Sequence, residues 1–121
     1  MALRTIEIGG KKRPISVGVA MTNYYCKGNG RNWTIRQFSD AFSDKRLKSM
    51  DFQIDEIIEL IYYALYTGAK ATGKEVDFTQ EDVLFWVDEA GMGVAGEVLS
   101  AMGDDVVNGK EPKKKKQATS T

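Results

Sequence analysis

Residues 91–96, with the sequence GMGVAG, have the G-x-G-x-x-G spacing of dinucleotide-binding loops. Such a loop binds a pyrophosphate only when it joins a strand to a helix inside a βαβ unit, with an acidic residue about 20 positions later. Here Thr79 and the acidic residues behind it predict a helix immediately upstream. We therefore interpret residues 91–96 as a break between two helices with close packing at glycine.

Residues 27–31 (KGNGR) are basic and rich in glycine, but they lack the G-K-[ST] ending of a phosphate-binding loop. We interpret this segment as a turn. The one cysteine, Cys26, would need a neighbouring base to act as a nucleophile, and the chain has no histidine to serve. We therefore interpret Cys26 as a small, buried, apolar side chain.

Two carboxylate pairs, at residues 88–89 and 104–105, are each formed by neighbours in sequence. Adjacent residues do not converge on one helix face, so paired-carboxylate chemistry is not indicated. With one cysteine and no histidine, the usual zinc and transition-metal sites cannot form. The sequence therefore predicts no catalytic residue, no metal ligand and no cofactor, and the protein is predicted not to be an enzyme.

The net charge of zero hides an asymmetry along the 121 residues. Residues 110–121 hold five lysines, four of them consecutive at 113–116, and one glutamate, which gives +4 and leaves −4 for residues 1–109. The lysine run has three interpretations: a solvated disordered tail, an arm for an acidic partner, or a frameshift point in the messenger RNA. Neither a signal peptide nor a membrane-spanning run is visible. The single cysteine excludes an internal disulfide, which fits a reducing cytoplasm.

The elements that would position any site are predominantly helical. Two runs around Gly9 and Gly10 predict an N-terminal β-hairpin. A helix is predicted at residues 34–44, where Thr34 and Gln37 form a capping box. Further predicted helices cover residues 52–70, a segment that starts at Thr79, and residues 94–102. Residues 19–27 are ambiguous. We expect an α+β fold, mostly α, with four or five helices in one domain at 1–107 and a disordered lysine-rich tail at 108–121.

The predicted helix 52–70 carries two different apolar faces. One stripe is aliphatic and holds Ile54, Ile57, Ile58, Ile61 and Leu65. The opposite side is aromatic and acidic, with Phe52, Tyr63 and Tyr66 mixed with Glu56 and Glu59. Either this helix is central in the fold, or its aromatic side meets a partner. Our candidates for partner contact are four aromatic residues: Phe52, Tyr63, Tyr66 and Phe85.

Nucleic-acid binding is an alternative that rests on a small cluster. Arg31, Trp33 and Arg36 place an aromatic ring between basic side chains, as single-strand binders do. The charge of −4 over residues 1–109 disfavours this alternative, because phosphate binding needs a basic face.

Four segments together resemble the tail assembly chaperones of long-tailed bacteriophages and of related prophages or gene-transfer elements. They are the hairpin at 5–11, the isoleucine-rich helix at 55–61, and the runs at 78–83 and 86–91. The similarity extends over about residues 3–103. The segment 19–51 is longer and richer in glycine and arginine than the resemblance predicts.

The resemblance implies a non-enzymatic chaperone that acts in the host cytoplasm and is absent from the mature virion. Such a chaperone keeps the apolar, helical tape-measure protein soluble, and a form extended by programmed frameshifting recruits tail-tube subunits. The lysine run lies where that frameshift is expected. Self-association stays open, since weak sites along one long partner add through effective concentration. The alternatives are another phage tail or connector protein and the nucleic-acid-binding regulator.

Overall fold

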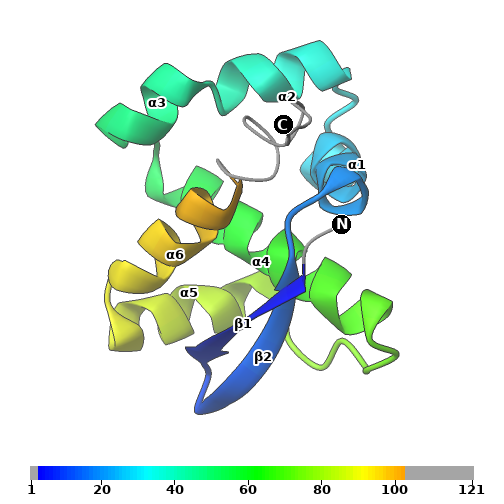
Figure 1. Ribbon diagram of the computed structural model, residues 1–121, viewed down its shortest axis with the longest axis vertical. Coiled ribbons are helices and arrows are strands. Elements are labelled where there is room, and N and C mark those ends of the chain that lie inside the picture. The colour runs from blue at the N-terminus through cyan, green and yellow to red at the C-terminus, as the bar shows by residue number, and fades with distance from the viewer. Residues whose placement is uncertain (1–2, 103–121) are drawn as a thin grey trace, which may run out of the picture.

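The computed structural model describes residues 3–102, which form a two-stranded hairpin followed by α-helices (Figure 1). The predicted class, α+β and mostly helical with an N-terminal hairpin, is confirmed. The predicted disordered lysine-rich tail at 108–121 lies outside the described residues. In residues 3–102 no helix combines the length and the apolar character needed to cross a bilayer.

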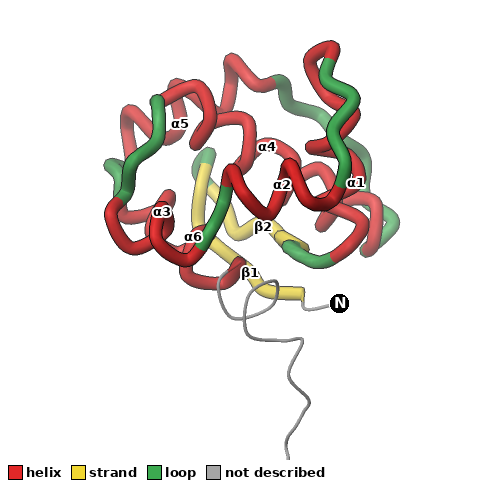
Figure 2. The backbone as a smooth tube through the Cα atoms, turned by 90° about the horizontal axis from the view of Figure 1, so that it is seen from above, coloured by secondary structure: helices red, strands yellow, loops and turns green. Residues whose placement is uncertain are grey.

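The hairpin pairs β1 (Leu3–Ile8) with β2 (Lys11–Ser16) in antiparallel register, with Ile6 opposite Arg13. Gly9 and Gly10 form the predicted turn, and both have positive φ, which glycine adopts without steric cost. A two-stranded hairpin is marginally stable alone. Here the buried side chains of Ile6, Ile8 and Ile15 attach the hairpin to the helices that surround it in Figure 2.

The central element is α4 (Ile54–Ala71), which Figure 1 shows passing behind the hairpin. It contacts β2, α1 (Val19–Lys27), α5 (Gln80–Ala90) and α6 (Gly93–Met102). The aliphatic stripe is buried except at Ile54, which is 56% exposed because the neighbouring elements do not cover the first turn. Leu60, outside that stripe, is fully buried. The helix is therefore central in the fold, while the tyrosines on its aromatic side keep part of their area exposed.

The segment between the hairpin and α4 contains three α-helices and one short 3-10 turn, η1 (Gly28–Gly30). The capping box of Thr34 and Gln37 starts α2 (Ile35–Ala41) as predicted. The helix ends before the predicted position because Phe42 leaves the helical conformation. Ser43 then caps α3 (Asp44–Ser49), a helix that the sequence did not predict. The ambiguous residues 19–27 form α1.

The C-terminal pair of helices follows the predicted boundaries closely. Thr79 caps α5, and its side chain accepts a hydrogen bond from the backbone N–H of Asp82 at 3.1 Å. Gly91 separates α5 from α6, so the predicted helix break is confirmed. The close packing predicted at these glycines is wrong, because a Cβ atom built at Gly91, Gly93 or Gly96 would meet no packed neighbour within 4 Å among the described residues. The element before this motif is a helix, whereas a dinucleotide loop requires a strand there.

Candidate functional site

Four tyrosines from two helices form a continuous surface that we call the tyrosine patch. Tyr24 belongs to α1, and Tyr62, Tyr63 and Tyr66 belong to α4. The ring centroids of Tyr24 and Tyr66 are 4.9 Å apart, and those of Tyr62 and Tyr63 are 5.1 Å apart, both edge-to-face. Every one of the four side chains keeps part of its area exposed. The patch is thus an aromatic surface that the protein leaves partly in contact with solvent.

The tyrosine patch has an inner and an outer half. Tyr62 and Tyr63 pack against the hydrophobic core, with Tyr62 5.7 Å from the ring of Phe78. Tyr63 also lies over Gly28, where any side chain would overlap its ring. Tyr24 and Tyr66 do not belong to the set that packs on the core. The outer pair is therefore the part of the patch with the least structural role.

A shallow hollow of about 580 Å³ adjoins the outer half of the patch. It is formed by the end of α4 and the loop that follows, with Tyr66, Lys70, Lys74, Glu75 and Asp77 among the residues lining it. The Nζ atom of Lys70 lies 5.5 Å from the Tyr66 ring centroid, a cation–π distance. Charged side chains thus border the exposed rings on this side.

Beneath the patch, Arg31 and Glu59 form a largely buried ion pair. Arg31 donates from Nη1 to Glu59 Oε1 at 3.0 Å and from Nη2 to Glu59 Oε2. Its Nε and Nη2 atoms also donate to the carbonyl oxygen of Tyr25, at 3.0 and 2.6 Å. Burial alone lowers the pKa of Arg31, but the hydrogen bond and charge of Glu59 outweigh it and raise that pKa. The pair attaches the segment after α1 to α4.

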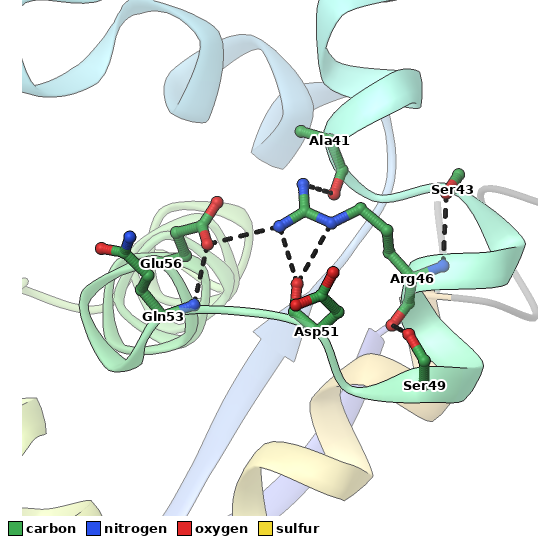
Figure 3. A network of polar contacts seen from close by, with 7 residues as sticks. All are labelled: Ala41, Ser43, Arg46, Ser49, Asp51, Gln53 and Glu56. Carbon is green, nitrogen blue, oxygen red and sulfur yellow. Dashed lines mark hydrogen bonds and ion pairs between the residues drawn. The ribbon is translucent and has the colours of Figure 1, made fainter.

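The second acid of the predicted aromatic-acidic face, Glu56, is also engaged within the protein (Figure 3). Its Oε1 atom accepts hydrogen bonds from the backbone N–H of Gln53 at 2.9 Å and from Nη2 of Arg46 at 3.4 Å. Arg46 in turn donates to the carbonyl oxygens of Ala41 and Asp51. Glu56 and Glu59 therefore stabilise internal junctions, and the expected acidic flank of the aromatic surface is not formed by them.

Of the four candidate contact residues, only Tyr63 and Tyr66 lie together. Phe52 stacks on Phe42 at 5.4 Å, with the Arg46 guanidinium 4.8 Å from the Phe52 ring, in the junction before α4. Phe85 is 62% exposed on α5 and makes no ring contact with the tyrosine patch. The structure thus separates the candidates into one cluster and two isolated positions.

Sequence reasoning missed Tyr24 and Tyr62 as members of the patch. The i, i+4 spacing of Tyr62 and Tyr66 is a signal that could have linked these two rings on one helix. Tyr24 carried no such signal, because it lies on α1, which only the fold brings beside α4.

The three candidates for nucleic-acid binding do not share one exposed face. Arg31 is occupied by Glu59 and by the carbonyl of Tyr25, and Trp33 packs partly buried against the core. Only Arg36 is exposed. The guanidinium of Arg31 lies 4.0 Å from the Tyr25 ring centroid and 5.1 Å from that of Trp33, so this arginine joins a packed interior cluster.

Burial favours the protonated form of the Cys26 thiol and of the two inner tyrosines of the patch, Tyr62 and Tyr63. Burial raises the pKa of the Cys26 thiol, against the smaller opposing effect of Arg31. Burial also raises the pKa of Tyr63 and Tyr62, with further contributions from the charges of Glu59 and Tyr66 respectively. Tyr62 and Tyr63 therefore present neutral phenols, which combine apolar ring surface with a hydroxyl that donates and accepts hydrogen bonds.

We expect the stability of the protein to fall as the pH rises above about 10, the ordinary tyrosine pKa. Burial, and next the Glu59 charge, raises the pKa of Tyr25 above that value in the folded state. Below about pH 10 the Tyr25 phenol is protonated in both the folded and the unfolded state. Above that pH the unfolded state loses this proton first, which favours unfolding. Each such phenol lowers the free energy of unfolding by up to about 1.4 kcal/mol per pH unit.

Urea denaturation at about pH 8, 10 and 11 measures this dependence. The variant Tyr25→Phe should show a shallower decline than the wild-type protein, because one of the raised groups is gone. An identical decline in both proteins would show that Tyr25 ionises in the folded state as easily as in the unfolded chain.

Comparison with protein-family models, curated proteins and solved structures finds no match to this chain.

Proposed function

We propose that this chain is a non-enzymatic tail assembly chaperone of a long-tailed bacteriophage or related element, and that the tyrosine patch binds apolar helical segments of the tape-measure protein. The observation that carries the binding role is the outer half of the patch, where Tyr24 and Tyr66 contact each other outside the core. The assignment to tail assembly rests on the sequence resemblance of residues 3–103.

A tape-measure protein with long apolar stripes would aggregate if it were left free in the host cytoplasm. A chaperone can prevent this with a surface that is aromatic enough to bind and polar enough to remain soluble. Tyrosine meets both demands, because its ring is apolar and its hydroxyl is hydrated. Recruitment of tail-tube subunits, a frameshift-extended form and absence from the mature virion belong to the same proposal.

We expect the variant Tyr24→Ser/Tyr66→Ser to lose solubilisation of the tape-measure protein while remaining folded. Truncating an interface tyrosine costs about 1–2 kcal/mol of binding, so the double variant should bind at least about tenfold more weakly. The measurement is the soluble fraction of the tape-measure protein of the same phage when the two proteins are co-expressed. Circular-dichroism melting of the variant tests folding in parallel.

The comparison variant is Phe85→Ser, which removes an exposed aromatic ring of α5 outside the patch. The proposal predicts that this variant solubilises the tape-measure protein as the wild type does. Loss of solubilisation in Phe85→Ser, with full retention in Tyr24→Ser/Tyr66→Ser, would place the docking surface on α5 and contradict the role given to the patch. Detection of the protein in purified virions would instead favour a structural role in the tail.

A further inference from the structure

Two lysines share a hollow with Tyr66, in the outer half of the tyrosine patch. Lys70 and Lys74 line the hollow beside Tyr66. Both lysines are exposed, and within residues 3–102 neither forms an ion pair. Lys27 is a third exposed lysine near the patch, because it precedes Gly28, which the Tyr63 ring contacts.

The acidic residues of the same hollow only partly balance these lysines. Asp77 already pairs with Arg13, whose Nη1 atom lies 3.5 Å from Asp77 Oδ1. Glu75 is exposed and offsets one positive charge. Glu56 and Glu59 bind arginines inside the protein, so they do not offset the remaining positive charge of the two lysines in the hollow. The border of the exposed rings therefore carries a net positive charge.

The backbone holds the two lysines of the hollow in fixed positions. Lys70 lies in the last turn of α4. The chain then turns at Gly73, and the backbone N–H of Lys74 donates to the carbonyl oxygen of Ala69 at 2.8 Å. The side chains of both lysines thus extend from ordered backbone at the end of α4, beside Tyr66. Their positive charges therefore border the aromatic surface.

We propose that the segment bound by the tyrosine patch is an apolar helix flanked by aspartate or glutamate, whose carboxylates lie against Lys70 and Lys74. This inference rests on the proposed function and adds the charge of the partner to it. Complementary charge at the edge of an interface guides association and selects the partner, while the apolar centre supplies most of the affinity.

Single-stranded nucleic acid is the other anionic occupant that lysines beside aromatic rings could attract. The geometry of the rings favours the acidic helix. The rings of Tyr24 and Tyr66 meet at 74°, and those of Tyr63 and Tyr66 at 73°, so each edge faces a neighbouring ring and no row of parallel faces is open for base stacking.

The test uses the full chain and two designed peptides with the same leucine face, one flanked by glutamates and the other by lysines. Isothermal titration calorimetry at low and at high salt measures both affinities. We expect the glutamate peptide to bind about tenfold more tightly at low salt, because two peripheral pairs each contribute modestly. The preference should shrink at about 1 M salt, where the screening length is about 3 Å.

The variant Lys70→Glu/Lys74→Glu should abolish or invert the preference, whereas the matched control Lys45→Glu on α3 should preserve it. Lys45 is exposed and forms no ion pair within residues 3–102. The lysine run at 113–116 is present in every protein compared, so its attraction for the glutamate peptide cancels between variants.

Equal affinity for both peptides, or binding of neither, would overturn the inference. A preference that survives in Lys70→Glu/Lys74→Glu would assign the charge selection to another site, and tighter binding of a single-stranded oligonucleotide at the same residues would favour nucleic acid. These outcomes are distinct from failure of the proposed function, which is read separately from tape-measure solubility in Tyr24→Ser/Tyr66→Ser. That solubility can be lost or kept independently of any charge preference.

Discussion

The variant Gly68→Ala should unfold about 4–24 °C below the wild-type protein. Gly68 lies inside α4, where alanine normally stabilises a helix by about 1 kcal/mol. Here a Cβ atom would lie 2.5 Å from the carbonyl carbon of Pro14 and 2.7 Å from the Cα of Ile15 in β2. These are backbone atoms of a paired strand and cannot move aside alone. Overpacking of this kind costs about 1–3 kcal/mol, and a domain of this size loses about 4–8 °C per kcal/mol.

The matched control for this substitution is Gly96→Ala in α6. Gly96 is also a glycine inside a helix, but among residues 3–102 no atom outside its own stretch of α6 lies within 4 Å of the position that its Cβ would occupy. We expect this variant to be more stable than the wild type by about 0.5–1 kcal/mol. Thermal melting of the two variants under identical conditions separates helix propensity from the contact with β2. Equal melting temperatures for Gly68→Ala and the wild type would contradict the close packing of α4 on the hairpin.

The second large effect is expected from Arg31→Met, which should lower the free energy of unfolding by about 3–5 kcal/mol. The substitution removes the guanidinium and leaves Glu59, only 6% exposed, without its partner. An isolated buried carboxylate is costly, because the charge has lost both water and its ion pair. The variant also loses two hydrogen bonds to the carbonyl of Tyr25. Urea denaturation, monitored by circular dichroism, measures the loss.

The double variant Arg31→Met/Glu59→Leu distinguishes a stranded charge from lost packing. Replacing both partners of a buried ion pair by apolar side chains is often nearly neutral, so the double variant should recover a large part of the lost stability. If the double variant is as unstable as the sum of both single variants, the cost arises from packing around Arg31 and not from an unpaired Glu59.

Local signals in the sequence were sufficient for much of the fold. The side chain of Thr34 accepts from the backbone N–H of Gln37 at 3.2 Å, and Thr79 does the same for Asp82, so both predicted helix starts are observed. The Gly9–Gly10 turn likewise fixes the hairpin. These features depend on residues within four positions of one another, which is why a single sequence reveals them.

The features that the sequence did not reveal depend on long-range contacts. Arg31 and Glu59 are 28 positions apart, and no pattern in the sequence indicates that they pair. The acidic residues of α4 therefore looked like an exposed flank. Similarly, Tyr24 joins Tyr66 only because α1 packs beside α4. The break between α2 and α3 depends on the conformation of Phe42, which the helical spacing of residues 34–44 conceals.

Photo-crosslinking from the tyrosine patch in infected host cells tests directly whether this surface binds the tape-measure protein. Tyr66 is replaced by p-benzoylphenylalanine, and Phe85 is replaced in the same way as the comparison position. Mass spectrometry then identifies the crosslinked protein. We expect crosslinks from position 66 to apolar helical segments of the tape-measure protein, and none or few from position 85. Crosslinks from position 85 alone, or from position 66 only to other proteins, would contradict this expectation.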